Sequence, residues 1–198
     1  MNKPTNFNDL LELQKILDEN IEKNRNNGFV PRERKDLDII LAIDDEFQEW
    51  LRELPYEYNF KTWKQKEYNR EKELEELTDI LFFFLQRCNS KTGKKYNNTY
   101  LECCEKSYIE TIFNTIGNTI GEVEEDKYFI INLNEAIERF KYDLHRGAVG
   151  FAFFNYIRCV CIRKFTKEDL LNTYYEKWQK NMTRINKDWV IQEWKSFY

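Results

Sequence analysis

Glycine and proline are scarce along this chain, and their scarcity limits the folds that the chain can adopt. Only six Gly and three Pro occur among 198 residues, whereas these two types together make up roughly 12% of an average protein. Strand-rich sandwiches, glycine-loop nucleotide folds and collagen-like arrays all need more of them. The 41% of residues that are apolar, and the 16% that are aromatic, suffice for a sizeable core. The composition predicts a mostly helical protein with one domain, residues 1–198.

Apolar residues recur at helical spacing in seven segments that polar stretches separate. The expected helices are Phe7–Lys23, Arg34–Leu54, Glu71–Arg87, Thr99–Asn118, Leu133–His145, Val149–Arg163 and Lys167–Trp189. Pro55 ends the second, because proline disfavours helical backbone in the residue before it. Thr166 and Asp169 form a pattern like a capping box at the start of the last. We therefore expect an all-α bundle.

Charge, cysteine content and hydropathy exclude several classes of protein. The 31 basic and 35 acidic residues leave a net charge of −4, which argues against direct nucleic-acid binding through a basic face. The five Cys have neither the spacing of a disulfide framework nor a CxxC zinc motif, so we expect reduced thiols and a cytoplasmic location. The longest apolar stretches, Ile80–Leu85 and Gly147–Phe154, are far shorter than the roughly 18–20 residues that span a membrane.

Two acidic pairs occur on successive expected helices. Glu46 and Glu49 are three residues apart, and so are Glu76 and Asp79, and such a spacing places both side chains of a pair on one helix face. If the two helices pack antiparallel, four carboxylates converge. Because such a group cannot stay ionised without a counter-charge, the pattern indicates Mg²⁺ or Mn²⁺ bound entirely by oxygen ligands.

The same pairs also fit ordinary solvated helix faces. Other acidic residues lie close by in the sequence, among them Asp44, Asp45 and Glu73, and one acidic pair at this spacing arises easily by chance. Two pairs beside apolar helix faces are less easily explained in this way. On spacing alone, both interpretations stay open.

Five segments, in order along the chain, carry a resemblance to a known family. They are Gln14 with Asp18, Glu46-x-x-Glu49, Trp63-Lys64 within F-K-T-W-K, Glu76-x-x-Asp79-Ile-Leu-x-Phe83, and Tyr174-x-x-Lys177-x-x-x-Asn181-x-x-Arg184. Together they resemble the dimeric dUTPases, which belong with the MazG-type enzymes to the all-α nucleoside triphosphate pyrophosphatases. The segments span residues 10–190, and only residues 91–164 rest on helical pattern alone. The family often has His at the position of Phe82, and Gln and then Tyr at those of Ile185 and Trp189.

The resemblance implies Mg²⁺-dependent hydrolysis of dUTP, and of dUDP, with Mn²⁺ as a substitute ion. It implies that Glu46, Glu49, Glu76 and Asp79 hold the metal and that Glu49 is the base for the attacking water. The residues implied in nucleotide binding are Gln14 and Asp18 at the uracil, Trp63 against the base, Phe83 beside the ribose 2′ position, and Lys64, Lys177, Asn181 and Arg184 at the phosphates and sugar.

The resemblance also implies a homodimer, for which Ile80–Leu85 and Ala148–Phe154 offer apolar surface. The Asn- and Lys-rich, Gly-poor usage fits an AT-rich genome such as that of a phage or a low-GC bacterium. Two alternatives remain at this stage. One is a MazG-like pyrophosphatase with another or broader nucleotide preference, and the other is a helical adaptor or regulator without catalysis.

Overall fold

The computed structural model describes residues 2–23, 35–64, 66–90, 99–116 and 132–184, with side chains in the fourth range described from residue 105. These ranges contain seven helices and no strand, which confirms the expected all-α class. The helices are α1 (Phe7–Lys23), α2 (Asp36–Glu53), α3 (Arg70–Asn89), α4 (Thr99–Asn114), α5 (Leu133–His145), α6 (Val149–Ile162) and α7 (Lys167–Arg184). Within the described ranges, no helix is both long and apolar enough to cross a membrane.

Side chains at the helix ends account for several of these boundaries. The Asn69 side chain accepts a hydrogen bond from the Lys72 N–H (3.0 Å) at the start of α3, which satisfies a backbone donor that the helix leaves unpaired. Thr166 and Asp169 exchange bonds between side chain and backbone N–H at 2.8 and 3.0 Å, which confirms the predicted cap of α7. Helix α4 ends at Asn114, four residues before the predicted end.

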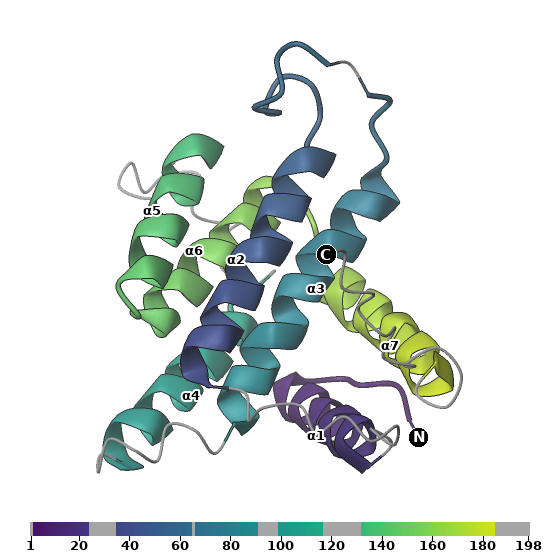
Figure 1. Cartoon of the computed structure of the whole chain (residues 1–198), viewed down its shortest axis with the longest axis vertical. Helices are drawn as coiled ribbons and strands as arrows, with labels where there is room; N and C mark the ends of the chain where they lie inside the picture. Colours follow the sequence, from purple (N-terminus) through teal and green to yellow (C-terminus); the bar gives the residue numbers. More distant parts are fainter. Residues whose placement is uncertain (1, 24–34, 65, 91–98, 117–131, 185–198) are drawn as a thin grey trace, which may run out of the picture.

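Helix α3 is the centre of the bundle and packs against α1, α2 and α7 (Figure 1). Its apolar run, Ile80–Leu85, is predicted from the sequence to offer surface for a homodimer, but the structure places most of it inside the chain. Five of its six residues are buried: Ile80, Leu81, Phe82, Phe84 and Leu85. The Phe84 ring meets Phe153 of α6 edge-on at 4.9 Å and lies 5.7 Å from the ring of Tyr156. Burial in the core therefore explains why this stretch of the helix is apolar on nearly every side.

Helices α2 and α3 are antiparallel along their length, as the carboxylate argument requires. Near the end of α2, the Trp50 indole donates to Glu73 (3.3 Å) in the first turn of α3. At the other end, Arg87 lies 3.6 Å from Asp36, the first residue of α2. These two contacts fix the register of the pair.

Glu73 is a buried carboxylate that joins α2, α3 and the segment after α6. Besides the Trp50 bond, its two oxygens accept from Arg163 (2.7 and 3.0 Å) and from the Tyr68 hydroxyl (2.7 Å). Its side chain has no exposed surface. A buried charge is tolerated only when it is paired and fully hydrogen-bonded, and Glu73 meets both conditions.

We expect Glu73→Gln to lower the free energy of unfolding by about 3 kcal/mol, because removing one partner of a buried ion pair leaves the other uncompensated. Urea unfolding followed by circular dichroism measures the change. Glu135→Gln is the control, since it breaks an exposed pair with Arg139 (2.8 Å) on one helix, worth about 0.3–0.5 kcal/mol. Equal losses in the two variants would contradict the role given to Glu73.

Candidate active site

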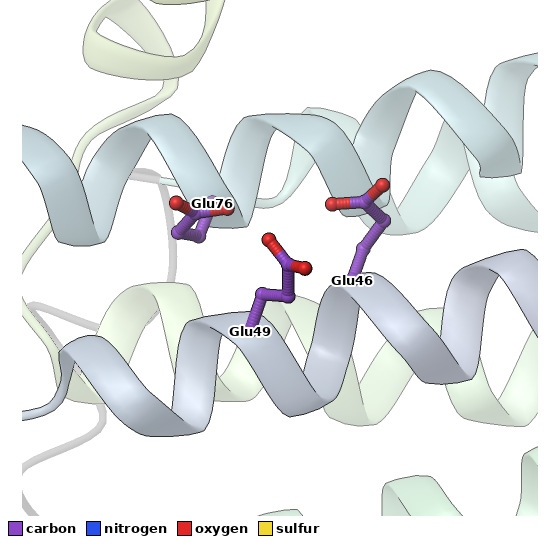
Figure 2. Close-up of side chains that lie close together, drawn as sticks. All are labelled: Glu46, Glu49 and Glu76. Carbon is purple, nitrogen blue, oxygen red and sulfur yellow. The ribbon is translucent and has the colours of Figure 1, made fainter. Parts of the chain in front are cut away.

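Three carboxylates meet in the seam between α2 and α3. Glu46 and Glu49 on α2 and Glu76 on α3 each place one carboxylate oxygen within 4.8 Å of the others. Figure 2 shows Glu46 and Glu49 extending from one helix toward the helix that carries Glu76. Glu49 is exposed, whereas Glu46 and Glu76 are half-buried. The antiparallel register thus brings together two acidic residues from one predicted pair and one from the other.

The electrostatics of this group show an excess of negative charge. Burial first, and then the neighbouring Asp79, Glu49 and Glu76 carboxylates, together raise the pKa of Glu46 to about 7, against a smaller opposing effect of Lys177. The pKa of Glu76 is also raised, first by burial and next by Asp79. Ionised carboxylates in such a group need a counter-charge. Their all-oxygen chemistry and spacing fit a divalent cation such as Mg²⁺.

Asp79 lies beside this group rather than within it. Its carboxylate forms an ion pair with Lys177 of α7, and the same ammonium group donates to the Glu75 carbonyl oxygen (3.1 Å). Burial raises the pKa of Asp79, while Lys177 lowers it. The structure therefore places Asp79, the fourth predicted ligand, next to the other three. Lys177, from a different helix, forms an ion pair with it.

The two residues predicted at the uracil, Gln14 and Asp18, are joined to one another and to two further helices. The Gln14 amide nitrogen donates to an Asp18 oxygen (2.9 Å), which also accepts from the Gln86 amide of α3 (2.9 Å). The Gln14 oxygen accepts from the hydroxyl of Tyr174 on α7 (2.8 Å). Gln14 is only 3% exposed. It is thus a buried, hydrogen-bonded amide rather than a surface side chain of an amphipathic helix.

The remaining predicted residues lie on three different segments. Trp63 and Lys64 are exposed in the connector between α2 and α3, where Trp63 keeps 78% of its surface. Phe83 is half-buried against the core, one helical turn after Asp79. On α7, Asn181 is half-buried and Arg184 is exposed at the last residue of the helix. Ile185 and Trp189 fall outside the described residues.

Two residues of this network, Tyr174 and Gln86, are absent from the site residues predicted from the sequence. Tyr174 opens the carboxy-terminal segment on which the family resemblance rests, but its partner is 160 positions away in the sequence. Gln86 follows Asp79 by seven residues, a spacing that returns to the same helix face. That spacing is a signal from which Gln86 could have been predicted.

An all-α bundle with grouped carboxylates on two antiparallel helices, and a lysine beside them, fits a metal-dependent nucleotide hydrolase. A comparison with protein families identifies the particular family: residues 6–189 match the family described as dUTPase. The chain belongs to this family of all-α enzymes, whose activity is the hydrolysis of dUTP. No match was found among curated proteins.

The raised pKa of Glu46 predicts an unusual pH dependence of stability in protein freed of metal by EDTA. Between its ordinary pKa of 4.5 and about 7, the folded state binds more protons at Glu46 than the unfolded state does. The contribution of Glu46 to the free energy of unfolding is therefore fully present below its ordinary pKa. It is lost as the pH rises through the pKa that Glu46 has in the folded state. We expect the melting temperature of the wild type, relative to Glu46→Gln, to fall from pH 5 to pH 8.

Differential scanning calorimetry at a series of pH values measures this relative change. Glu138→Gln, which alters an exposed glutamate of α5, serves as the matched control and should run parallel to the wild type. A difference between wild type and Glu46→Gln that does not change with pH would rule out the expected uncompensated charge.

Proposed function

We propose that this dUTPase works with Mg²⁺, held by Glu46, Glu49, Glu76 and Asp79, and cleaves dUTP to dUMP and pyrophosphate. Hydrolysis of dUDP is part of the proposal, as is Mn²⁺ as a substitute ion. The observation that carries it is the meeting of three carboxylate oxygens within 4.8 Å across the seam. A bound divalent ion would screen the charge of the phosphates and polarise the phosphorus under attack.

Glu49 is the residue that we assign as the general base. Of the three grouped carboxylates it is the exposed one, so a water molecule can reach it from solvent while Glu46 and Glu76 stay half-buried. A carboxylate within hydrogen-bond reach of the attacking water orients that water and takes its proton. Exposure to solvent is thus the reason for assigning the base to Glu49 and not to Glu46 or Glu76.

The nucleotide is expected to lie across α1, α3 and α7. Lys177 already contacts Asp79 of α3, so its ammonium group is placed for phosphate oxygens that approach the carboxylates. Asn181 and Arg184 follow on the same face of α7, and a guanidinium group can bind phosphate through two hydrogen bonds. Lys64 would add a further phosphate contact from the connector.

Four residues are assigned to the nucleoside. Trp63 is exposed and would lie against the base, while Gln14 and Asp18 would contact the uracil edge. Phe83, one turn beyond Asp79 and half-buried, would crowd a ribose 2′-hydroxyl and so favour deoxyribose. The network around Gln14 supports this arrangement, because it joins the helix for the base to the helix for the metal.

The test is pyrophosphate release from dUTP, dTTP, dCTP and UTP, and phosphate release from dUDP, with Mg²⁺ and with EDTA. We expect turnover of dUTP and dUDP that requires the metal. Glu49→Gln should lower kcat by about 10²–10⁴-fold, the usual contribution of a general base, without loss of the fold. Glu71→Gln, at an exposed position in the first turn of α3, is the control.

Each other outcome has a definite meaning. Turnover of several nucleotides would support a MazG-like specificity and contradict the uracil assignment. No turnover by folded protein that binds Mg²⁺ would favour the adaptor or regulator. Unchanged kcat in Glu49→Gln would remove Glu49 as the base while leaving the reaction intact.

We also propose a homodimer that forms through the outer face of α6. Of the two predicted apolar surfaces, Ile80–Leu85 is mostly buried within one chain. The other presents Phe151, which is 62% exposed and lies 6.0 Å from the Tyr108 ring of α4. An apolar patch of this kind is typical of an interaction surface.

Phe151→Asp should convert the dimer into a monomer, because a second copy would have to bury the introduced charge. Light scattering coupled to size-exclusion chromatography gives the mass. Tyr56→Ser, which alters an exposed aromatic residue of the connector, should remain dimeric. A wild type that is monomeric at micromolar concentration would refute the dimer, and a dimeric Phe151→Asp would place the interface elsewhere.

A further inference from the structure

The Gln14 side chain is held at both of its polar atoms. Its nitrogen donates to Asp18 (2.9 Å) and its oxygen accepts from the Tyr174 hydroxyl (2.8 Å). An amide has two N–H groups and two oxygen lone pairs, so these two bonds use one of each. Within the described structure, one N–H and one lone pair of Gln14 remain for a ligand.

The bonds fix which end of the amide faces which neighbour. The Asp18 oxygen also receives the Gln86 amide N–H (2.9 Å), as expected of a carboxylate, which only accepts when it is ionised. The Gln14 nitrogen must therefore face Asp18, and its oxygen must face Tyr174. Burial raises the pKa of the Tyr174 hydroxyl well above its ordinary value, with a further contribution from Asp18, so this hydroxyl keeps its proton and donates it.

Rotation of the amide by half a turn would break both bonds. The Gln14 oxygen would then lie against the Asp18 carboxylate, where two acceptors repel. The Tyr174 hydroxyl could accept from the turned N–H₂, but its own proton would lose the acceptor that it has in the described structure. A buried polar group left without its partner is destabilising, because it has lost its bonds to water and gained none in return. Tyr174 and Asp18 thus act from opposite ends to hold one amide orientation.

The orientation of an amide decides which pyrimidine it can bind. Uracil presents an N3–H donor next to the O4 acceptor, whereas cytosine presents an N3 acceptor next to the N4 amino donor. The two edges have opposite patterns. An amide that pairs with one must turn over to pair with the other, and an amide that cannot turn therefore selects between them.

We propose that Tyr174 is a specificity-determining positioning residue, which holds the Gln14 amide in the orientation that accepts uracil and rejects cytosine. This inference rests on the proposed contact between Gln14 and the base. Tyr174 itself acts through Gln14 and touches no reacting atom. The substrate class that it excludes is the deoxycytidine nucleotides.

The surroundings of Tyr174 keep its hydroxyl in place and separate this role from simple helix packing. The residue is fully buried, and the Phe82 ring stacks on it at 4.1 Å with an interplanar angle of 20°. Helices α1 and α7 are joined independently by the Trp178 indole, which donates to the Leu13 carbonyl oxygen (2.8 Å). Loss of the hydroxyl alone therefore leaves the two helices connected.

The test is kcat/KM for dUTP and for dCTP in the wild type and in Tyr174→Phe. We expect the dUTP/dCTP ratio to fall about tenfold or more, the factor that corresponds to one buried hydrogen bond. The change should appear as a higher KM for dUTP with kcat largely kept. Competitive inhibition by dUMP and dCMP supplies the same ratio without turnover.

Tyr156→Phe is the matched control, since it also removes a buried tyrosine hydroxyl, one that donates to the Leu77 carbonyl oxygen (2.9 Å). It should keep the ratio within about twofold of the wild type, the spread expected where no base contact changes. An unchanged ratio in folded Tyr174→Phe would overturn the inference. So would an equal fall in both variants, because the effect would then belong to any buried hydroxyl.

A second variant applies if Tyr174→Phe does not fold. Asp18→Asn replaces the carboxylate by a group that can donate, and it therefore permits the turned-over amide; an unchanged dUTP/dCTP ratio here would also contradict the inference. Measurements on the wild type distinguish failure of the proposed function from failure of the role given to Tyr174. If it cleaves no nucleotide, the proposed function fails, while unequal loss of dUMP and dCMP binding in Tyr174→Phe still tests the role of Tyr174.

Discussion

Repulsion between carboxylates in the seam of α2 and α3 is the constraint on which the rest of the site depends. Glu46, Glu49 and Glu76 have oxygens within 4.8 Å of one another, and burial and mutual repulsion together raise the pKa of Glu46 to about 7. Like charges separate unless the backbone holds them. The core of the bundle does so, because α3 is buried on several sides and cannot shift away from α2.

The register of that helix pair is therefore as important to function as the acidic residues themselves. Trp50 and Glu73 tie one end of the seam, and Arg163 anchors the same carboxylate from beyond α6. A shift of one residue would turn the acidic face by about 100°. The polar cluster around Glu73 thus preserves a geometry that lies one helical turn away, at Glu76.

The bundle could be predicted from the sequence because its signals are local. Helical periodicity located α1 and α5 at their observed bounds, and Thr166 with Asp169 marked the start of α7. The grouping of Glu46, Glu49 and Glu76 also followed from i,i+3 spacing once an antiparallel pair was assumed. Such features depend on residues a few positions apart, for which elementary helix geometry suffices.

Features that depend on distant pairings could not be predicted in the same way. No spacing rule connects Lys177 with Asp79 or Tyr174 with Gln14, because these contacts exist only after the helices have packed. The apolar run of α3 is another example: periodicity cannot distinguish a buried helix from one that meets a second subunit. Packing placed Ile80 and its neighbours inside the chain, which left α6 as the candidate contact face.

The pairing of Gln14 with Tyr174 joins positions 160 residues apart, and this separation has a consequence during protein synthesis. A nascent chain that has emerged from the ribosome through α3 already contains every carboxylate of the seam. It still lacks α7, and with it both the lysine beside Asp79 and the hydroxyl beside Gln14. Contacts so far apart in sequence form late because a long loop must close first. Synthesis of the carboxylate-bearing helices α2 and α3 therefore precedes that of Lys177 and Tyr174 on α7, which contact Asp79 and Gln14.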